Sequence, residues 1–219
     1  MSERFLTIMK LMIQALLETL YMSLASTFFA VLIGFMIAVV LVITDKNGLS
    51  PNRYVYNALD VVVNTFRSFP FIILIIILFP FTKIIVGKIT GTTASIIPLT
   101  IGAAPFVARI IENAFKEVHY GIIEAAKSFG AGKLQIIFKV MLPEAMPSII
   151  SAITLTLIVI VGFSAMAGAV GGGGLGQVAI QYGYHGFQAD VLFITVVILI
   201  ALVQLFQALG NMVYKIIKH

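Results

Sequence analysis

A candidate phosphate-binding loop is the run Gly171-Gly172-Gly173-Gly174-Leu175-Gly176, because glycine-rich loops can bind phosphate groups through their backbone amides. A nucleotide-binding loop of that type continues with Lys and then Ser or Thr, which reach the phosphates and the magnesium ion. The run lacks that continuation and follows a long apolar segment rather than a strand. We interpret it as irregular backbone at the outer end of a membrane span. Together with Gly168 it is either part of an external gate or a close helix-packing turn.

No residues have the types and spacing of a catalytic or metal site. The chain has no cysteine, which excludes disulfides, cysteine-ligated metals and thiol nucleophiles. Its histidines, His119, His185 and His219, do not have the spacing of metal ligands. No set of nucleophile, acid and base stands out either. We therefore expect a protein that is not an enzyme and that holds no cofactor or metal of its own.

The segment Glu124–Pro143, EAAKSFGAGKLQIIFKVMLP, is a charged, amphipathic island between long hydrophobic segments. Its pattern predicts a helix with one apolar face (Ile122, Ile123, Ala126 and Phe129) that ends at Gly130-Ala131-Gly132. A second short helix is expected over about Lys133–Met141, and Pro143 is expected to begin the next element. Two short helices with a glycine elbow suit insertion into a groove on a partner. The alternative is a helix on the membrane surface, with Lys127, Lys133 and Lys139 against anionic headgroups.

Composition places the chain in a membrane. Of its 219 residues 60% are hydrophobic and only 11% are charged, whereas soluble domains have about 25% charged residues. We predict an all-α integral membrane protein with a single domain over 1–219, a helical core at about 15–213 and the docking loop at about 120–143. Five spans are expected, each long enough to cross a bilayer at about 20 residues. They are about Thr19–Ile43, preceded by an interfacial helix, Ala58–Phe81, Thr93–Phe115, Pro147–Ala167 and Val191–Val213.

The basic residues predict the orientation. With the island on the cytoplasmic side, ten Lys and Arg lie inside and four outside. This distribution follows the positive-inside rule and puts the N-terminus outside and the C-terminus in the cytoplasm. Arg67 and Asp60 are expected near the cytoplasmic end of the second span, and a net charge of +5 does not call for nucleic acid as a partner.

Small residues and prolines within the spans indicate a translocation pathway or close helix packing. The third span carries Gly102 and Pro105, and small residues allow a neighbouring helix to approach. The fourth carries Phe163, Ser164, Met166 and Gly168, with Met166 as a flexible plug. No Lys, Arg, Asp or Glu other than Asp190 lies between 162 and 213, which suits the passage of an apolar zwitterion.

The island, with Glu124-Ala125-Ala126, Gly130 and Leu142-Pro143, closely resembles the EAA loop of bacterial ABC importer permeases. Nearly the whole chain is similar to the methionine-importer permease family, on the segments Arg67–Gly87, Pro98–Phe115, Gly162–Gln177 and Gln181–Phe187. One departure is Val140, where the broad pattern often has Ile.

The resemblance implies a type I ABC importer transmembrane fold with five helices per subunit and a cytoplasmic coupling loop. It implies a second copy of the chain, two cytoplasmic ATPase subunits that bind ATP and Mg²⁺, an outer-face lipoprotein that delivers methionine, and a bacterial inner membrane. Glu124, Ala125, Ala126, Gly130, Leu142 and Pro143 would couple to the ATPase. The alternatives are a permease for a different small amino acid, or a passive channel or secondary transporter. An ion-coupled transporter usually has intramembrane carboxylates, and the spans offer little beyond Asp60.

Overall fold

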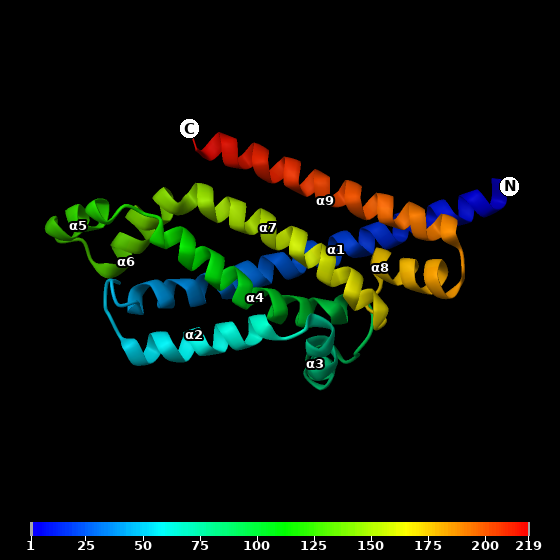
Figure 1. The fold of residues 1–219 in the computed structure, drawn as a ribbon, viewed down its shortest axis with the longest axis horizontal. Coiled ribbons are helices and arrows are strands. Elements are labelled where there is room, and N and C mark those ends of the chain that lie inside the picture. Colours follow the sequence, from blue (N-terminus) through cyan, green and yellow to red (C-terminus); the bar gives the residue numbers. More distant parts are fainter. Residues whose placement is uncertain (1, 219) are drawn as a thin grey trace.

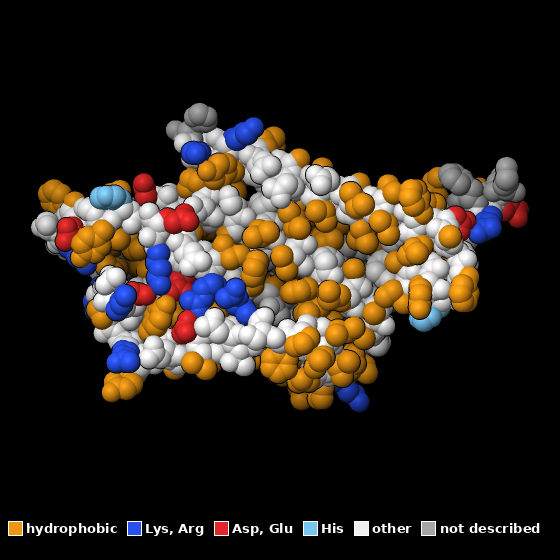
Figure 2. All heavy atoms as spheres, in the orientation of Figure 1, with side chains coloured by type: hydrophobic (Ala, Val, Ile, Leu, Met, Phe, Trp, Pro, Cys, Tyr) orange, Lys and Arg blue, Asp and Glu red, His pale blue; other side chains and the backbone are white. Residues whose placement is uncertain are grey.

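The computed structural model describes residues 2–218, and all the regular secondary structure in that range is helical (Figure 1). Four helices are long and apolar enough to cross a membrane singly, and a bent pair supplies a fifth crossing if it counts as one span. The predicted all-α membrane fold is therefore confirmed. On the face in Figure 2, apolar side chains cover much of the surface over α3 and α7, whereas charged ones gather near α2 and α5 and at the opposite tip.

The first helix, α1 (Ser2–Thr44), is continuous over 43 residues. The predicted division into an interfacial helix and a span from Thr19 is wrong, because this stretch has no proline and its one glycine is Gly34. At 1.5 Å per residue, α1 is about 65 Å long, roughly twice the thickness of the hydrocarbon core. It therefore extends well beyond any single crossing.

The second predicted span, Ala58–Phe81, is two helices. The helices α2 (Arg53–Ser68) and α3 (Phe71–Val86) meet at 109°. The break lies at Pro70, which has no amide to continue α2 and holds Phe69 in an extended conformation (φ −71°, ψ 130°). Arg67 lies in the last turn of α2, about 21 Å along the axis from Arg53. Arg67 therefore lies beside the bend between α2 and α3, while its position relative to the cytoplasmic side stays a prediction.

The centre of the bundle is α4 (Thr92–Lys116), which matches the predicted span Thr93–Phe115. It packs against α1, α2, α3 and α7. Its residues Leu99, Val107, Ile111 and Phe115 belong to the largest buried apolar cluster. This helix consequently holds the other elements in register.

Beyond α4 the chain forms α5 (Tyr120–Ser128), a short turn, and then α6 (Lys133–Gln135), the π-helical stretch η1 (Ile136–Met141) and α7 (Leu142–Ala169). The last three form one helix of 37 residues, Lys133–Ala169. An element boundary lies beside Pro143 as predicted, since η1 ends at Met141 and α7 begins at Leu142, but the helix continues through this boundary without a break. The wider turn of η1 immediately before Pro143 accommodates the proline ring, which would clash within a regular α-helix.

After α7 the glycine run turns the chain into α8 (Gly174–Val178) and the π-helical η2 (Ala179–His185), which precede α9 (Ala189–Ile217). The helix α9 packs along α7 and contains the predicted span Val191–Val213. We call the end of the molecule that carries α5 the α5 end and the opposite one the α8 end. The chain starts at the α8 end, and α9 finishes toward the α5 end (Figure 1), as an odd number of crossings requires.

Candidate docking segment and pathway residues

The helix α5 has defined caps at both ends. At its start the His119 Nδ1 accepts a hydrogen bond from the Gly121 amide (3.1 Å). At its end the Gly130 amide donates to the Lys127 carbonyl (2.9 Å), and the Ala131 amide donates to the Ala126 carbonyl (3.1 Å). Gly130 has a φ of +76°, in the left-handed region that favours glycine. The predicted glycine elbow is confirmed.

The predicted apolar face of α5 is divided between the core and the surface. Ile123 and Ala126 are half-buried and pack against the main apolar cluster. Ile122 and Phe129 are exposed, and Phe129 is 91% exposed. Glu124 and Ala125 are exposed as well. The interior therefore accounts for only one half of the apolar residues on this helix.

Further apolar side chains are exposed on the same short segment. Leu134 on α6 is 65% exposed, and Phe138 on η1 is 48% exposed. At the end of the segment, Leu142 packs against the core and Pro143 is exposed. We call the exposed apolar set the docking patch; it consists of Tyr120, Ile122, Phe129, Leu134 and Phe138. They lie on or beside the short helices beyond α4, near the charged side chains at the α5 end, rather than on the long apolar helices.

Three of the predicted pathway residues are not fully buried: Met166 and Phe163 on α7 and Gly102 on α4. Met166 is 48% exposed on α7. One turn away, the Phe163 ring stacks on the Phe71 ring of α3, with centroids 4.0 Å apart and planes 7° from parallel. Gly102 of α4 lies under the same Phe71 ring, and a Cβ added there would be 2.9 Å from it. The structure thus brings Phe163 and Gly102 together around Phe71, which the sequence did not indicate.

The other three predicted pathway residues face the interior. Ser164 is buried and donates a hydrogen bond to the Val161 carbonyl (2.8 Å). Pro105 is buried within α4. Gly168 is buried against the backbone of α8, where an added Cβ would lie 2.3 Å from the Gln177 nitrogen. These positions correspond to close packing, the alternative considered for Gly168.

The backbone amides of the glycine run already have acceptors. The Gly173 amide donates to Gln177 Oε1 (2.8 Å), the Gly174 amide to Glu18 Oε2 (2.7 Å) and the Leu175 amide to Thr19 Oγ1 (2.9 Å). A phosphate-binding loop needs such amides free to face the ligand. The run therefore serves to fix α8 against α1 and α7.

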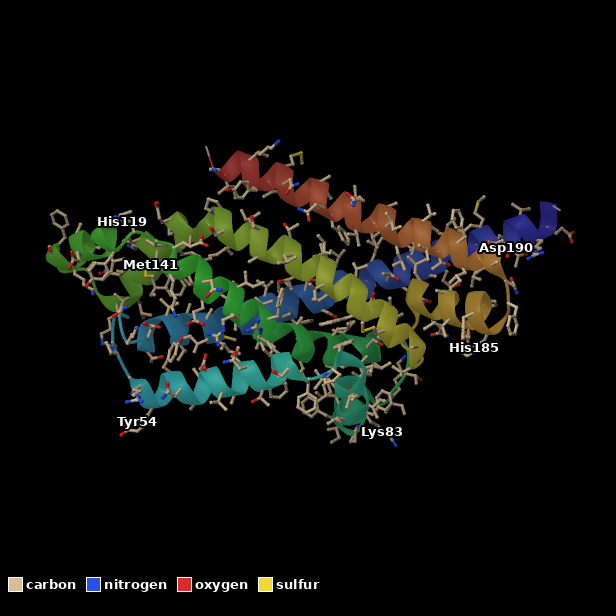
Figure 3. The ribbon with its side chains drawn as sticks, in the orientation of Figure 1. Tyr54, Lys83, His119, Met141, His185 and Asp190 are labelled. Atoms are coloured by element: carbon tan, nitrogen blue, oxygen red, sulfur yellow. The ribbon has the colours of Figure 1, made fainter. Side chains whose placement is uncertain are left out.

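The histidines that the structure describes do not lie together. His119 lies at the α5 end and His185 at the α8 end (Figure 3), and His219 lies outside the described residues. Within residues 2–218 no group of three metal-ligating side chains is present. That the chain holds no cofactor stays a prediction.

An ionic cluster that sequence analysis did not assemble joins α2 and α4. Glu112 is fully buried, and its carboxylate contacts Arg109 Nη1 (2.8 Å) and Lys116 Nζ (2.7 Å). The Tyr56 hydroxyl of α2 donates to it at 3.0 Å. Arg109 also pairs with Asp60, which the sequence left without a partner. The sequence could have indicated the pairs within α4, because Arg109 and Glu112 are three residues apart and Glu112 and Lys116 are four apart, which places their side chains side by side on a helix.

The same cluster extends to the end of α1. Lys116 Nζ lies 2.8 Å from Asp45 Oδ2. Burial alone would raise the pKa of Asp45, but the Asn47 amide and the Lys116 ammonium group hold it below its ordinary value. Asp45 therefore remains charged near neutral pH, and α1, α2 and α4 are tied together at this end.

Comparison with known proteins gives matches over most of the chain. The family described as "Binding-protein-dependent transport system inner membrane component" matches residues 30–219. A probable D-methionine transport system permease protein of Vibrio cholerae is 49% identical over 209 residues, which are 95% of this chain and 93% of that protein. A methionine import system permease protein of Bacillus subtilis is 49% identical over 177 residues, which are 81% of this chain and 80% of that protein.

Solved structures agree with these matches. A structure of inward-facing conformations of the MetNI methionine ABC transporter superimposes with a TM-score of 0.95 at 46% identity, covering 96% of this chain and 98% of that one. An amino acid ABC transporter with histidines gives a TM-score of 0.80 at 22% identity, over 97% of this chain and 96% of that one. The second comparison shows a common fold alone.

Proposed function

The chain belongs to the family of binding-protein-dependent transport system inner membrane components, and from this premise we propose that it is the permease subunit of an ATP-driven methionine importer. Two copies form the pathway, and two ATPase subunits at the α5 end bind ATP and Mg²⁺. An outer lipoprotein delivers the amino acid at the α8 end. The chain itself catalyses no covalent reaction.

The observation that carries this proposal is the similarity to named methionine permeases over nearly the full length. Relatives from Vibrio cholerae and Bacillus subtilis are each 49% identical, and the MetNI structure superimposes at a TM-score of 0.95. A match of this extent includes the docking segment, the α2–α3 bend and the glycine run together. Transport of the same substrate is therefore the simplest assignment.

The docking patch is the surface on which an ATPase subunit binds. Its exposed aromatic and aliphatic side chains supply burial, and the glycine elbow fixes the relative directions of α5 and α6. The exposed carboxylate of Glu124 and exposed Ala125 lie on the same helix and allow close contact. This role places the α5 end in the cytoplasm of a bacterium, with the N-terminus outside and the C-terminus inside.

Movement of the ATPase reaches the pathway through the helix Lys133–Ala169, which begins at the docking segment and carries Phe163 and Met166 near its far end. Closure of the ATPase dimer on ATP displaces the docking segments of both copies. The helices that carry Phe163 and Met166 then shift, and the pathway opens alternately to either side.

Uptake by reconstituted vesicles tests the proposal. Vesicles that contain this chain, its ATPase and its lipoprotein are expected to accumulate labelled methionine only when ATP is inside. Uptake without ATP would contradict the importer and favour a passive channel or secondary transporter. ATP-dependent uptake of another amino acid but not of methionine would retain the mechanism and reject the substrate.

A further inference from the structure

A cavity of about 480 Å³ lies where the bend between α2 and α3 meets α4 and α7. Pockets for small molecules in proteins have volumes of about 300–1,000 Å³, so this one is large enough for an amino acid. Four elements contribute to its wall, through Arg67, Ser68, Phe71, Gly102, Phe106 and Phe163. Since the two candidate pathway residues Gly102 and Phe163 are among them, the cavity adjoins the proposed pathway.

The cavity lies along the parts of α4 and α7 that are apolar enough to cross a membrane. Gly102 is about 15 Å along α4 from its start, and Phe163 is about 9 Å along α7 from its end. Both distances begin at the α8 end, and the hydrocarbon core is about 30 Å thick. A charged residue at such a depth is costly and usually faces a cavity or a functional partner. Arg67 is such a residue.

Arg67 differs from Arg109, the other arginine of this part of the bundle. The Arg109 guanidinium is paired with Asp60 and Glu112 and also donates to Asn64 (3.2 Å). Within residues 2–218, Arg67 makes no ion pair and no side-chain hydrogen bond, and its side chain is exposed on the cavity wall. Its guanidinium therefore keeps donors that can take a carboxylate in a two-point contact.

The remainder of the wall complements the other parts of an apolar amino acid. Phe71 and Phe163 stack face to face at 4.0 Å, and Phe106 lies beside them on α4. A thioether or aliphatic side chain packs favourably against aromatic rings. The Ser68 hydroxyl donates to the Asn64 carbonyl (2.9 Å), so its own oxygen can still accept from an ammonium group.

We propose that this cavity is a transit site for the imported amino acid, in which Arg67 binds the α-carboxylate and Phe71, Phe106 and Phe163 receive the apolar side chain. The proposal rests on the importer function above. It places one fixed charge in a pathway for which sequence analysis expected few, because the charge comes from α2 rather than from α7 or α9. The site selects for a free carboxylate next to an apolar chain.

The test uses the assembled transporter in vesicles and a methionine analogue that carries a photoreactive diazirine. Illumination of wild-type transporter is expected to label the peptides that contain Phe106 and Phe163. R67Q should lower both this labelling and ATP-dependent methionine uptake about tenfold or more, because a charge-assisted two-point contact is lost. The matched control is R53Q, which removes the same charge from the first residue of α2, outside the cavity.

The outcomes separate the two proposals. Suppose that the wild type takes up methionine and that R67Q and R53Q are equal to each other in labelling and in uptake. That result would overturn the site and leave the proposed function intact. Lack of uptake in wild type would overturn the function, whereas labelling elsewhere than the cavity overturns the site in either case. If R67Q does not assemble with the ATPase, R67K takes its place as the test variant. Lysine keeps the positive charge but lacks the planar guanidinium that makes a two-point contact, so R67K should also be labelled less than R53Q. Labelling of R67K equal to that of R53Q would contradict the proposal.

Discussion

Phe129 offers the sharpest test of the docking patch. Its side chain is 91% exposed on the turn after α5, so the isolated permease gains almost nothing from its burial. If the ring is buried against the ATPase, removal of it in Phe129→Ala forfeits about 1.5–3 kcal/mol of apolar burial. Such a loss raises the Kd for the ATPase about 10- to 150-fold. Membrane insertion and the thermal stability of the permease alone should not change.

Phe187 provides the matched control, because it is 92% exposed and follows His185, the last residue of η2, which lies at the α8 end (Figure 3). The assay is the Kd between purified ATPase and permease in nanodiscs, measured for wild type, Phe129→Ala and Phe187→Ala. The reasoning predicts a large effect at Phe129 and none at Phe187. An unchanged Kd for Phe129→Ala, or equal weakening by both substitutions, would refute it.

Three other substitutions test the geometry at separate places. Gly130→Ala should weaken ATPase binding about 5- to 30-fold in the same assay, because φ is +76° and a left-handed residue costs about 1–2 kcal/mol. Gly132→Ala, with a φ of −69°, should bind as wild type does. Glu112→Gln should lower the free energy of unfolding by about 1.5–3 kcal/mol, measured by denaturation in detergent, because it weakens the charge-assisted hydrogen bonds at a buried site; an unchanged midpoint would contradict this. Gly168→Ala should reduce the yield of folded protein, since its Cβ would meet the α8 backbone at 2.3 Å, whereas Gly162→Ala, with nothing within 4 Å, should be tolerated; equal yields would count against this packing.

Elements whose limits depend on local residues were predicted well from the sequence. The bounds of α4 match because Gly91 precedes the helix and Lys116 and Glu117 mark its end, and the elbow at Gly130 follows from the need for a left-handed residue at a helix end. The sequence did not indicate that α1 and Lys133–Ala169 are continuous helices. Polar residues do not interrupt α1, and a proline after a π-helical turn does not interrupt Lys133–Ala169, because packing supports both helices.

The arrangement of side chains in space could not be predicted in the same way. Asp60 and Arg109 are 49 positions apart, and no spacing rule pairs them. The sequence also could not separate Met166, which is exposed, from Ser164 and Gly168 on the buried side of the same helix. Which side of the helix is buried depends on where α8 packs against α7. The sequence did not predict α8, because it begins within a run of glycines.

The length of Lys133–Ala169 has a geometric consequence. A straight helix of 37 residues is about 55 Å long, so a tilt of about 10° around its first turn sweeps its last turn sideways by about 10 Å. Small angular changes at its first turn are thereby amplified at its last turn. If the ATPase binds this segment as proposed, it needs to move only a short distance to displace Phe163 near the far end of the helix.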